Sequence, residues 1–444
     1  MKHIRVIGGG LAGPEAALQA ASRGCKVSLY EMRPHRSTEA HQTADFAELV
    51  CSNSLKSESG NSAPWLLKQE MRRAGCFLLA DADATAVPAG HALAVDRVAF
   101  SERVAQRLAR SPNIAIHREE VTSLDPAAAD LTILASGPLT SAPLTEALQA
   151  ITGFNHLAFY DSISPIVDAG TIDMDKVYMA ARWDRGTPDY INCPFTKEQY
   201  DAFIDALATA EQAESKEWEK LQYFEGCLPI EETARRGRDT LRFGPMKPAG
   251  LTNPKTGRWP YAAVQLRCEN LRADSYNLVG FQNHLKFGEQ ARILRMIPGL
   301  EGATFLRYGQ IHRNTYIHAP SLLSETLQLK NQPALLIAGQ LSGVEGYTES
   351  IASGMLAGRF AAELLDGRTP EPAPRLSAHG SLIHYITHSE SKSFQPANIT
   401  FDLLPPLEGD LRKRIRDKKE RHRIQCERAL AAFDQWLAKS AVPA

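Results

Sequence analysis

The stretch HIRVIGGGLAGPEAALQAASRGCKVSLYE, residues 3–31, is the most informative local pattern in the chain. An apolar run, a glycine-rich turn over 8–13 and an alanine-rich segment over 14–22 predict a strand, a tight turn and a helix. A second apolar run ends at Glu31, 18 positions after Gly13. In such a unit the turn approaches a pyrophosphate, the helix N-terminus receives its charge and the acid binds a ribose. The predicted dinucleotide-binding residues are Gly8, Gly9, Gly10, Leu11, Ala12, Gly13 and Glu31.

Two later segments indicate which dinucleotide is bound. Residues 334–340 form a buried apolar run that ends in glycine, followed by a glycine-rich turn and a helix, and 131–137 is a similar shorter run. In flavoproteins of the glutathione-reductase type, the late strand returns to the first domain and its helix directs its N-terminus at the flavin. A plain NAD dehydrogenase needs the first unit alone, so three segments indicate FAD. Because glycines let the backbone approach a ring, we expect the flavin to be lined by Gly339, Gly343, Gly346 and Tyr347.

This layout predicts an α/β fold, in which a glutathione-reductase-type FAD-binding Rossmann domain is discontinuous and carries an inserted α+β domain and a C-terminal helical tail. We expect the FAD-binding domain over 1–140 and 305–370. The insertion, over 141–304, would contribute to the substrate site and contain a helix across 198–221. Residues 371–444 would form a linker and a basic C-terminal segment.

The composition is typical of a globular protein, with 43% hydrophobic and 23% charged residues over 444 positions. A net charge of −1 excludes a global attraction to nucleic acid, so a polyanion must meet a local basic patch. We expect neither a signal segment nor a membrane span. Seven scattered cysteines without a CxxC pair favour a reducing cytoplasm over a disulfide framework. We expect a cytoplasmic protein without a metal site, which acts as a monomer or a weak dimer.

Eight further motifs occur together. They are EMRP (31–34), LVCSNSLKSE (49–58), EMRRAG (70–75), ALAVDR (92–97), LRFGPMKPAGL (241–251), MIPGLE (296–301), YGQIHRNTYIHAP (308–320) and AGQLSGVEGYTESIASGMLAG (338–358). With them, nearly the whole chain resembles the bacterial folate- and FAD-dependent tRNA (uracil-5-)-methyltransferase family, TrmFO. The resemblance implies methylation of a T-loop uridine of tRNA to 5-methyluridine. It also implies 5,10-methylenetetrahydrofolate as one-carbon donor, FAD as electron carrier and NADH or NADPH as reductant.

The resemblance assigns roles to two cysteines. Uracil C5 becomes nucleophilic when a thiolate adds at C6, and a base must later remove the C5 proton. By resemblance, Cys227 in FEGCLP matches the family's nucleophile, and Cys51 in VCSNSL matches the second cysteine, assigned as the general base. The residues themselves leave open which of the two attacks. Four polar residues follow Cys51, namely Ser52, Asn53, Ser54 and Lys56. Such residues rarely surround a cysteine in a hydrophobic core, and they could bind an anion or the edge of a pyrimidine.

The resemblance also places the folate, whose pterin must lie on the flavin. It implies that Asn283 and His284, in VGFQNHLKF, contact the pterin, with the imidazole over the ring.

Contacts with tRNA are predicted from charge. Arg235, Arg236 and Arg238 follow Cys227 closely, and residues 411–428 hold nine Lys or Arg against three acids. In the second group we expect phosphate contacts from Arg412, Lys413 and Arg414. The alternative for this segment is an amphipathic helix that packs on the body through residues such as Phe433. A flipped base also needs an aromatic surface, which Tyr223, Phe224 or Phe243 would supply.

Three other functions are considered. The relative GidA shares the AGQ…G…GY…G segment, which would imply wobble-uridine modification with the same cofactors, but its chains are longer and lack FGPMKPAGL. An RNA-binding flavoprotein that acts mainly in tRNA folding is a second alternative. Disulfide reduction is disfavoured because no close cysteine pair follows the first nucleotide motif.

Overall fold

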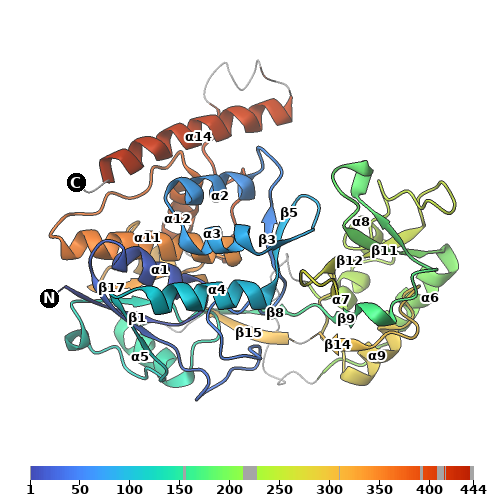
Figure 1. The fold of residues 1–444 in the computed structure, drawn as a ribbon, viewed down its shortest axis with the longest axis horizontal. Coiled ribbons are helices and arrows are strands. Elements are labelled where there is room, and N and C mark those ends of the chain that lie inside the picture. Colours follow the sequence, from blue (N-terminus) through green and yellow to red (C-terminus); the bar gives the residue numbers. More distant parts are fainter. Residues whose placement is uncertain are drawn as a thin grey trace.

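The computed structural model describes residues 2–153, 157–213, 228–309, 311–390, 394–407, 415 and 417–440, with the backbone alone at 157–162 and 311–313. It has two bodies, seen side by side in Figure 1, which an antiparallel pair of strands connects. These strands are β8 (Leu157–Ser162) and β15 (Ile311–Tyr316). The chain leaves the larger body through β8 and returns to it through β15.

The larger body contains a six-stranded sheet of order β16-β17-β7-β1-β2-β6. Its strands are β1 (His3–Ile7), β2 (Lys26–Tyr30), β6 (Ile114–His117), β7 (Leu131–Leu134), β16 (Gln328–Leu329) and β17 (Gln332–Ile337). All neighbours pair in parallel except β16 and β17. Because β17 returns from late in the chain to pair with β7, the predicted discontinuous Rossmann fold is confirmed.

Two helices of this body pack very closely. They are α1 (Ala12–Ala21) and α11 (Tyr347–Leu365), which lie side by side in Figure 1. A Cβ at Gly354 would lie 2.3 Å from the Ala12 carbonyl oxygen, and one at Gly358 would lie 2.4 Å from that of Ala16. Glycine therefore lets the two backbones touch. Since these contacts advance in the same direction along both helices, the helices are parallel and their N-termini lie at the same end.

The other helices of the larger body complete its core. They are α2 (Ala63–Arg73), α3 (Phe77–Ala84), α4 (Arg97–Arg110), α5 (Ala142–Thr152), α10 (Ala319–Leu322), α12 (Ala378–His388) and α14 (Lys418–Ser440). Because α5, α12 and α14 contribute to this core, it extends beyond the ranges 1–140 and 305–370. The proposed domain boundaries stay a prediction.

The C-terminal helix α14 lies along the outside of the larger body (Figure 1). Phe433 is fully buried and stacks on the His379 ring, with centroids 5.0 Å apart. Trp436 donates from Nε1 to the Glu371 carbonyl at 2.9 Å and lies 5.3 Å from the Arg359 guanidinium. The packing interpretation of this segment is thus confirmed for Phe433.

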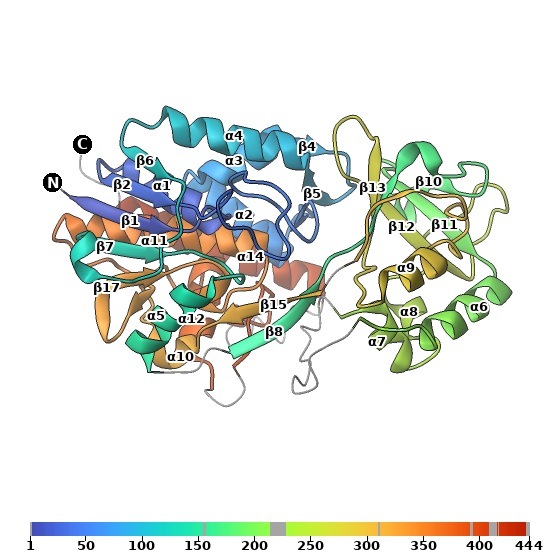
Figure 2. The same cartoon turned by 90° about the horizontal axis from the view of Figure 1, so that it is seen from below.

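The second body is built on an antiparallel six-stranded sheet of order β10-β11-β12-β13-β9-β14 (Figure 2). The strands are β9 (Ile166–Asp168), β10 (Tyr178–Ala180), β11 (Tyr190–Phe195), β12 (Ala262–Cys268), β13 (Ser275–Leu278) and β14 (Phe305–Arg307). The helices are α6 (Lys197–Ala208), α7 (Ile230–Arg235), α8 (Thr240–Phe243) and α9 (Phe287–Leu294). The helix expected across 198–221 is wrong for 209–213, because α6 ends at Ala208 and Gln212 forms a bridge with Leu285. Residues 214–221 lie outside the described part of the chain.

A three-stranded sheet of order β3-β5-β4 lies on the side of the larger body that faces the second body (Figure 1). Its strands are β3 (Ser54–Ser57), β4 (Ala86–Val87) and β5 (Ala92–Val95). Cys51 lies three residues before β3, on the loop that leads into this sheet.

Candidate cofactor and active site

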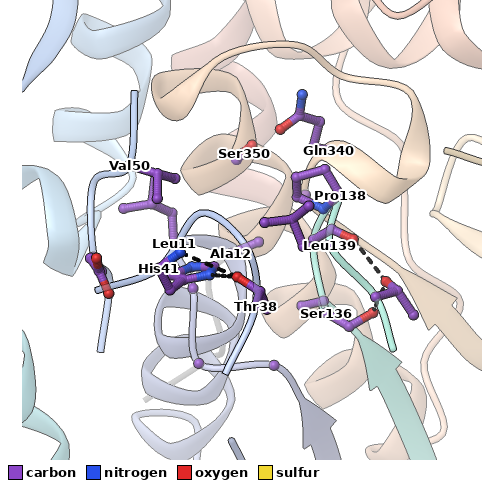
Figure 3. A pocket seen from close by; sticks show the side chains of 18 of the residues that line it. Leu11, Ala12, Thr38, His41, Val50, Ser136, Pro138, Leu139, Gln340 and Ser350 are labelled. Atoms are coloured by element: carbon purple, nitrogen blue, oxygen red, sulfur yellow. Dashed lines mark hydrogen bonds between the residues drawn. The ribbon is translucent and has the colours of Figure 1, made fainter. Parts of the chain in front are cut away.

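A cavity of about 420 Å³ opens at the carboxyl ends of the parallel strands. Its wall includes Gly8 after β1, Glu31 after β2, Ala135 after β7 and Gly339 just beyond β17. Open α/β sheets bind their ligands at this edge. Figure 3 shows side chains from these segments gathered around the start of α1.

The glycine turn after β1 has the geometry of a dinucleotide site. The Gly9 amide donates a 2.8 Å hydrogen bond to Glu31 Oε2. A Cβ at Gly13 would lie 1.8 Å from the Gly8 carbonyl oxygen, so only glycine lets α1 approach the turn so closely. At Gly10, in contrast, a Cβ would meet nothing within 4 Å, and this residue lines the cavity. The turn is therefore packed on its protein side and open on its cavity side.

Glu31 is a buried acid that keeps its charge. Burial raises its pKa, but the hydrogen bonds and charge of Arg33 outweigh burial and hold the pKa below its ordinary value. Arg33 donates to Oε1 from its backbone nitrogen and from Nε, both at 2.9 Å. An ionised carboxylate at the end of β2 is the acceptor that a ribose hydroxyl requires.

The buried amide of Asn314 is a test of whether the cavity suits FAD. Its side chain is 1% exposed and lines the cavity, and neither Nδ2 nor Oδ1 has a hydrogen-bond partner in the described part of the chain. Buried amides are nearly always paired, so this one suits a ligand with both donors and acceptors, as a flavin ring has. With Glu31 and the open edge at Gly10, Asn314 makes this cavity fit FAD. The motif YGQIHRNTYIHAP contains Asn314, but nothing in the sequence marked it as a site residue.

The residues predicted to line the flavin separate into two groups. Gly339, Gly346 and Tyr347 lie in the cavity wall, and Gly346 caps the N-terminus of α11. Gly343 is not among the lining residues. A Cβ at Gly343 would lie 2.5 Å from the Phe394 ring, so this glycine makes room for a protein side chain.

Cys51 lies in the cavity wall on a loop that three side chains hold. Its amide donates to the Tyr347 hydroxyl at 2.6 Å. Arg97 and Arg307 both donate to the Val50 carbonyl oxygen, at 3.4 and 3.0 Å. Both guanidinium groups also interact electrostatically with Cys51, and cations near a thiol favour the thiolate. The loop thus presents a half-buried thiol to the cavity in an electropositive setting.

Asn53, two residues further on, connects the two bodies. It is fully buried, donating from Nδ2 to the carbonyls of Val95 (3.1 Å) and Cys268 (2.9 Å), and accepting from Arg267 Nε at 3.0 Å. These bonds occupy the amide, so the expectation that Asn53 holds a pyrimidine edge is wrong. Lys56 does line the cavity, and its Nζ pairs with Glu349 at 2.7 Å.

The predicted pterin residues lie behind the cavity wall. Gln282 lines the cavity, whereas Asn283 and His284 do not. Asn283 is fully buried and its Oδ1 accepts from the Leu285 amide at 3.3 Å. His284 is 7% exposed, and its Nδ1 has no hydrogen-bond partner among the described residues. This segment therefore reaches the cavity through Gln282, and the pterin contacts of Asn283 and His284 stay a prediction.

This segment also anchors the start of α7. The Ile230 amide donates to the Gln282 carbonyl at 2.9 Å, and Glu231 Oε1 accepts from the His284 amide at 2.6 Å. Cys227 precedes α7 closely in the sequence but lies outside the described residues, so its predicted role stays a proposal. The start of α7, which follows Cys227 in the sequence, is therefore hydrogen-bonded to the segment that contains Gln282, and Gln282 lines the cavity.

Glu231 gives a testable pH dependence. Burial raises its pKa from its ordinary value of 4.5 to about 7. Between these values the folded protein retains a proton that the unfolded chain has lost, so the free energy of unfolding falls as pH rises through this window. We expect the decline between pH 5 and 8 to reach about 3 kcal/mol and to be absent in Glu231→Gln, which keeps the acceptor for His284. Urea denaturation across this range measures it, with Glu232→Gln as control; parallel profiles for wild type and Glu231→Gln would contradict it.

The predicted RNA-binding arginines are partly engaged with acids. Arg235 pairs with Glu232, and Arg238 pairs with Asp205 at 2.5 Å and Asp201 at 3.2 Å, both on α6. Arg236 also makes an interaction. The other three predicted contacts, Arg412, Lys413 and Arg414, lie outside the described residues, as do Tyr223 and Phe224. All six arginine and lysine assignments therefore stay predictions.

One group of potential metal ligands occurs in the described part of the chain. Glu325, His384 and His388 have ligand-type atoms within 4.8 Å of one another. The same atoms are close enough to pair without an ion, because Glu325 Oε1 lies 3.3 Å from His384 Nδ1 and 3.7 Å from His388 Nδ1. The predicted lack of a metal site is not tested by this geometry.

The family profile described as "Glucose inhibited division protein A" (GIDA) matches residues 3–369. A crystal structure of GidA from Aquifex aeolicus superimposes with a TM-score of 0.71 over 98% of this chain and 76% of that chain, at 17% identity. At that identity the likeness concerns the fold alone. The fold and the glycine-lined cavity define a flavoprotein of the GidA type, which confirms the predicted fold class.

Curated relatives specify the family. "Methylenetetrahydrofolate--tRNA-(uracil-5-)-methyltransferase TrmFO" from Koribacter versatilis is 65% identical over 439 residues, covering 99% of both chains. The protein of the same name from Solibacter usitatus is 58% identical over 440 residues and covers 98% of both chains. This chain belongs to the TrmFO family, as its motifs predicted. In the part of the chain that the structure describes, every helix is too short or too polar to cross a membrane.

Proposed function

We propose that this protein methylates C5 of a uridine in tRNA, with methylenetetrahydrofolate as the one-carbon donor and FAD as the bound cofactor. The observation that carries the proposal is the near-full-length identity of 65% to a relative of that name. The cavity supports it independently, because its glycine turn, Glu31 and Asn314 fit FAD and a thiol lies in its wall. When bound and reduced, FAD would supply the electrons that convert the transferred carbon to a methyl group.

The two cysteines would carry the covalent chemistry. A thiolate adds to uracil C6, which forms a C6–S bond and makes C5 nucleophilic toward the one-carbon unit. A base then removes the C5 proton while the bond between the transferred carbon and the folate nitrogen breaks, which releases tetrahydrofolate. Once the remaining methylene group has been reduced to a methyl group, the C6–S bond breaks and the thiolate leaves. We assign the addition to Cys227 by resemblance and the proton removal to Cys51. The electropositive loop around Cys51 supports a thiolate there, which is the form that accepts a proton.

The remaining components are proposals of the same kind. The tRNA is expected to enter by its T-arm, and the folate to lie near Gln282, Asn283 and His284. NADH or NADPH would reduce the flavin. The protein would act in the cytoplasm as a monomer or a weak dimer.

A labelling experiment tests this function. The FAD-loaded protein is incubated with an unmodified tRNA transcript, NADPH and methylenetetrahydrofolate labelled in the transferred carbon, and the RNA is digested to nucleosides. Label in 5-methyluridine from the T-loop supports the proposal. Label at the wobble uridine instead would support GidA chemistry, and RNA binding without label would leave a role in tRNA folding. A transcript with cytidine at the T-loop target serves as control.

A further inference from the structure

Two tryptophans lie exposed at one edge of the second body. Trp183, 54% exposed, belongs to the turn after β10, and Trp259, 49% exposed, lies just before β12. Their ring centroids are 5.1 Å apart and the rings are nearly perpendicular. Large aromatic side chains are usually mostly buried, and an exposed cluster of them marks a surface that meets a partner.

The backbone holds Trp183 outward at a conformational cost. Trp183 has a φ of 62° and Asp184 a φ of 50°, a left-handed conformation that bulky residues rarely adopt. The Trp183 amide donates to the Gly250 carbonyl at 2.7 Å, and Arg182 Nη2 donates to Gln265 Oε1 at 2.9 Å. Strain that the surrounding contacts enforce is characteristic of functional positions.

The indole of Trp183 packs one face on Gly250. A Cβ at Gly250 would lie 2.6–2.8 Å from three contiguous ring atoms, so the ring lies flat over this glycine. Only a glycine leaves space for such a contact. Since the residue remains 54% exposed although the Gly250 backbone covers one face of the ring, part of the ring is accessible to a flat ligand.

Positive charge surrounds the tryptophan pair. Within 182–186 and 247–259 the sequence has five cations and one acid, Asp184. The cations are Arg182, Arg185, Lys247, Lys255 and Arg258. None of the five forms an ion pair with a residue that the structure describes, and Arg182 and Lys255 donate to backbone carbonyls of Ala249 and Asp175. The surface therefore combines accessible aromatic rings with unneutralised cations, as single-stranded nucleic-acid sites do.

One loop connects this surface with the cavity. The loop 244–250 ends at Gly250 beneath Trp183, and its Pro245 packs against Gly280, where a Cβ would lie 2.8 Å from the proline. Gly280 is close in sequence to Gln282, which lines the cavity. Phe243, 77% exposed, precedes the loop directly. A partner on the tryptophan pair would therefore contact the structure that extends to the cavity wall.

We propose that Trp183 and Trp259 form a stacking platform for unpaired bases of the tRNA substrate, with the neighbouring cations contacting its phosphates. The inference rests on the proposed function and identifies where the RNA is held. RNA suits this surface better than a protein partner does, because the platform is bordered by cations and the exposed rings can stack on bases of any sequence.

The test measures RNA affinity apart from chemistry. FAD-loaded Trp183→Leu and Trp259→Leu proteins are titrated with an unmodified tRNA transcript without folate, at fixed salt. Loss of one stacking contact is expected to raise Kd on the order of 5- to 100-fold. Trp183→Phe and Trp259→Phe should restore most of the affinity, and Leu271→Ala, which removes another exposed apolar side chain (61%), should leave it unchanged. Arg258→Gln should lower the slope of log Kd against the logarithm of the salt concentration by about one, because one phosphate contact is lost. The leucine variants should keep the wild-type slope.

The outcomes separate this inference from the proposed function. Wild-type affinity in both leucine variants, with methylation intact, would overturn the platform and leave the methyltransferase assignment standing. Loss of a concentration-dependent self-association, with RNA affinity unchanged, would assign the pair to a protein contact and likewise overturn it. Wild-type protein that binds no tRNA would overturn both. Far-ultraviolet circular dichroism and flavin content confirm that each variant is folded.

Discussion

FAD-loaded Cys227→Ala is expected to form no detectable 5-methyluridine, and Cys51→Ala to lose about 10²- to 10⁴-fold in methylation rate, while both proteins remain yellow. The complete loss of product in Cys227→Ala follows because no other group forms the C6–S bond in the proposed chemistry. The loss of rate in Cys51→Ala is the usual contribution of a positioned general base. Cys51→Ala should not disturb the loop, because the contact with Tyr347 is made by the backbone amide. Single-turnover assays with labelled methylenetetrahydrofolate measure both rates.

The control is a cysteine outside the cavity. Cys268 is 6% exposed, and its thiol donates to the Asn270 carbonyl at 2.9 Å. Cys268→Ser keeps a donor there and should methylate at the wild-type rate. A tRNA with 5-fluorouridine at the target, which cannot lose a C5 proton, should form a covalent adduct with Cys51→Ala and none with Cys227→Ala. The reverse pattern would exchange the two roles, and wild-type turnover in either alanine variant would refute its assignment.

Gly10→Ala is expected to weaken FAD binding by at least about tenfold with little effect on the stability of the apoprotein. A Cβ at this position meets no protein atom within 4 Å and enters the cavity where the turn is open. The added methyl group therefore costs the apoprotein no contact but occupies space at the place where the backbone approaches a pyrophosphate. Flavin fluorescence on titration of apoprotein with FAD measures the affinity, and thermal unfolding of the apoprotein measures the stability.

Gly13→Ala provides the contrast to Gly10→Ala. Its Cβ would lie 1.8 Å from the Gly8 carbonyl oxygen, so the turn or α1 must shift even without cofactor. We expect this variant to lose FAD affinity and to unfold at a lower temperature. Equal FAD affinity in Gly10→Ala and wild type would show that the dinucleotide does not pass this edge of the turn.

The features that sequence could predict are local ones. The strand, glycine turn, helix and acid of residues 3–31 are adjacent in the chain, so their spacing alone defines the dinucleotide unit, and β17 was recognisable because a buried strand running into glycine is itself a local pattern. The helix expected across 198–221 does not extend over 209–213, because a tertiary bridge between Gln212 and Leu285 competes there with helix propensity.

The features that sequence missed depend on tertiary contacts. Asn314 matters because its amide is buried without a partner among the described residues, which no sequence pattern records. Gly343 has the small size and positive φ expected beside a flavin, yet the same properties serve to accommodate Phe394. Asn53 resembled a substrate ligand because it is polar and close to Cys51, but its partners come from strands far away in the sequence.

The amide of Asn53 and the ion pair between Arg97 and Glu269, 2.5 Å apart, join the two bodies at the loop that carries Cys51. Any rotation of the second body would break these bonds or pull the loop with it, and so displace the sulfur from the cavity wall. The placement of the second body and that of the Cys51 sulfur are therefore coupled.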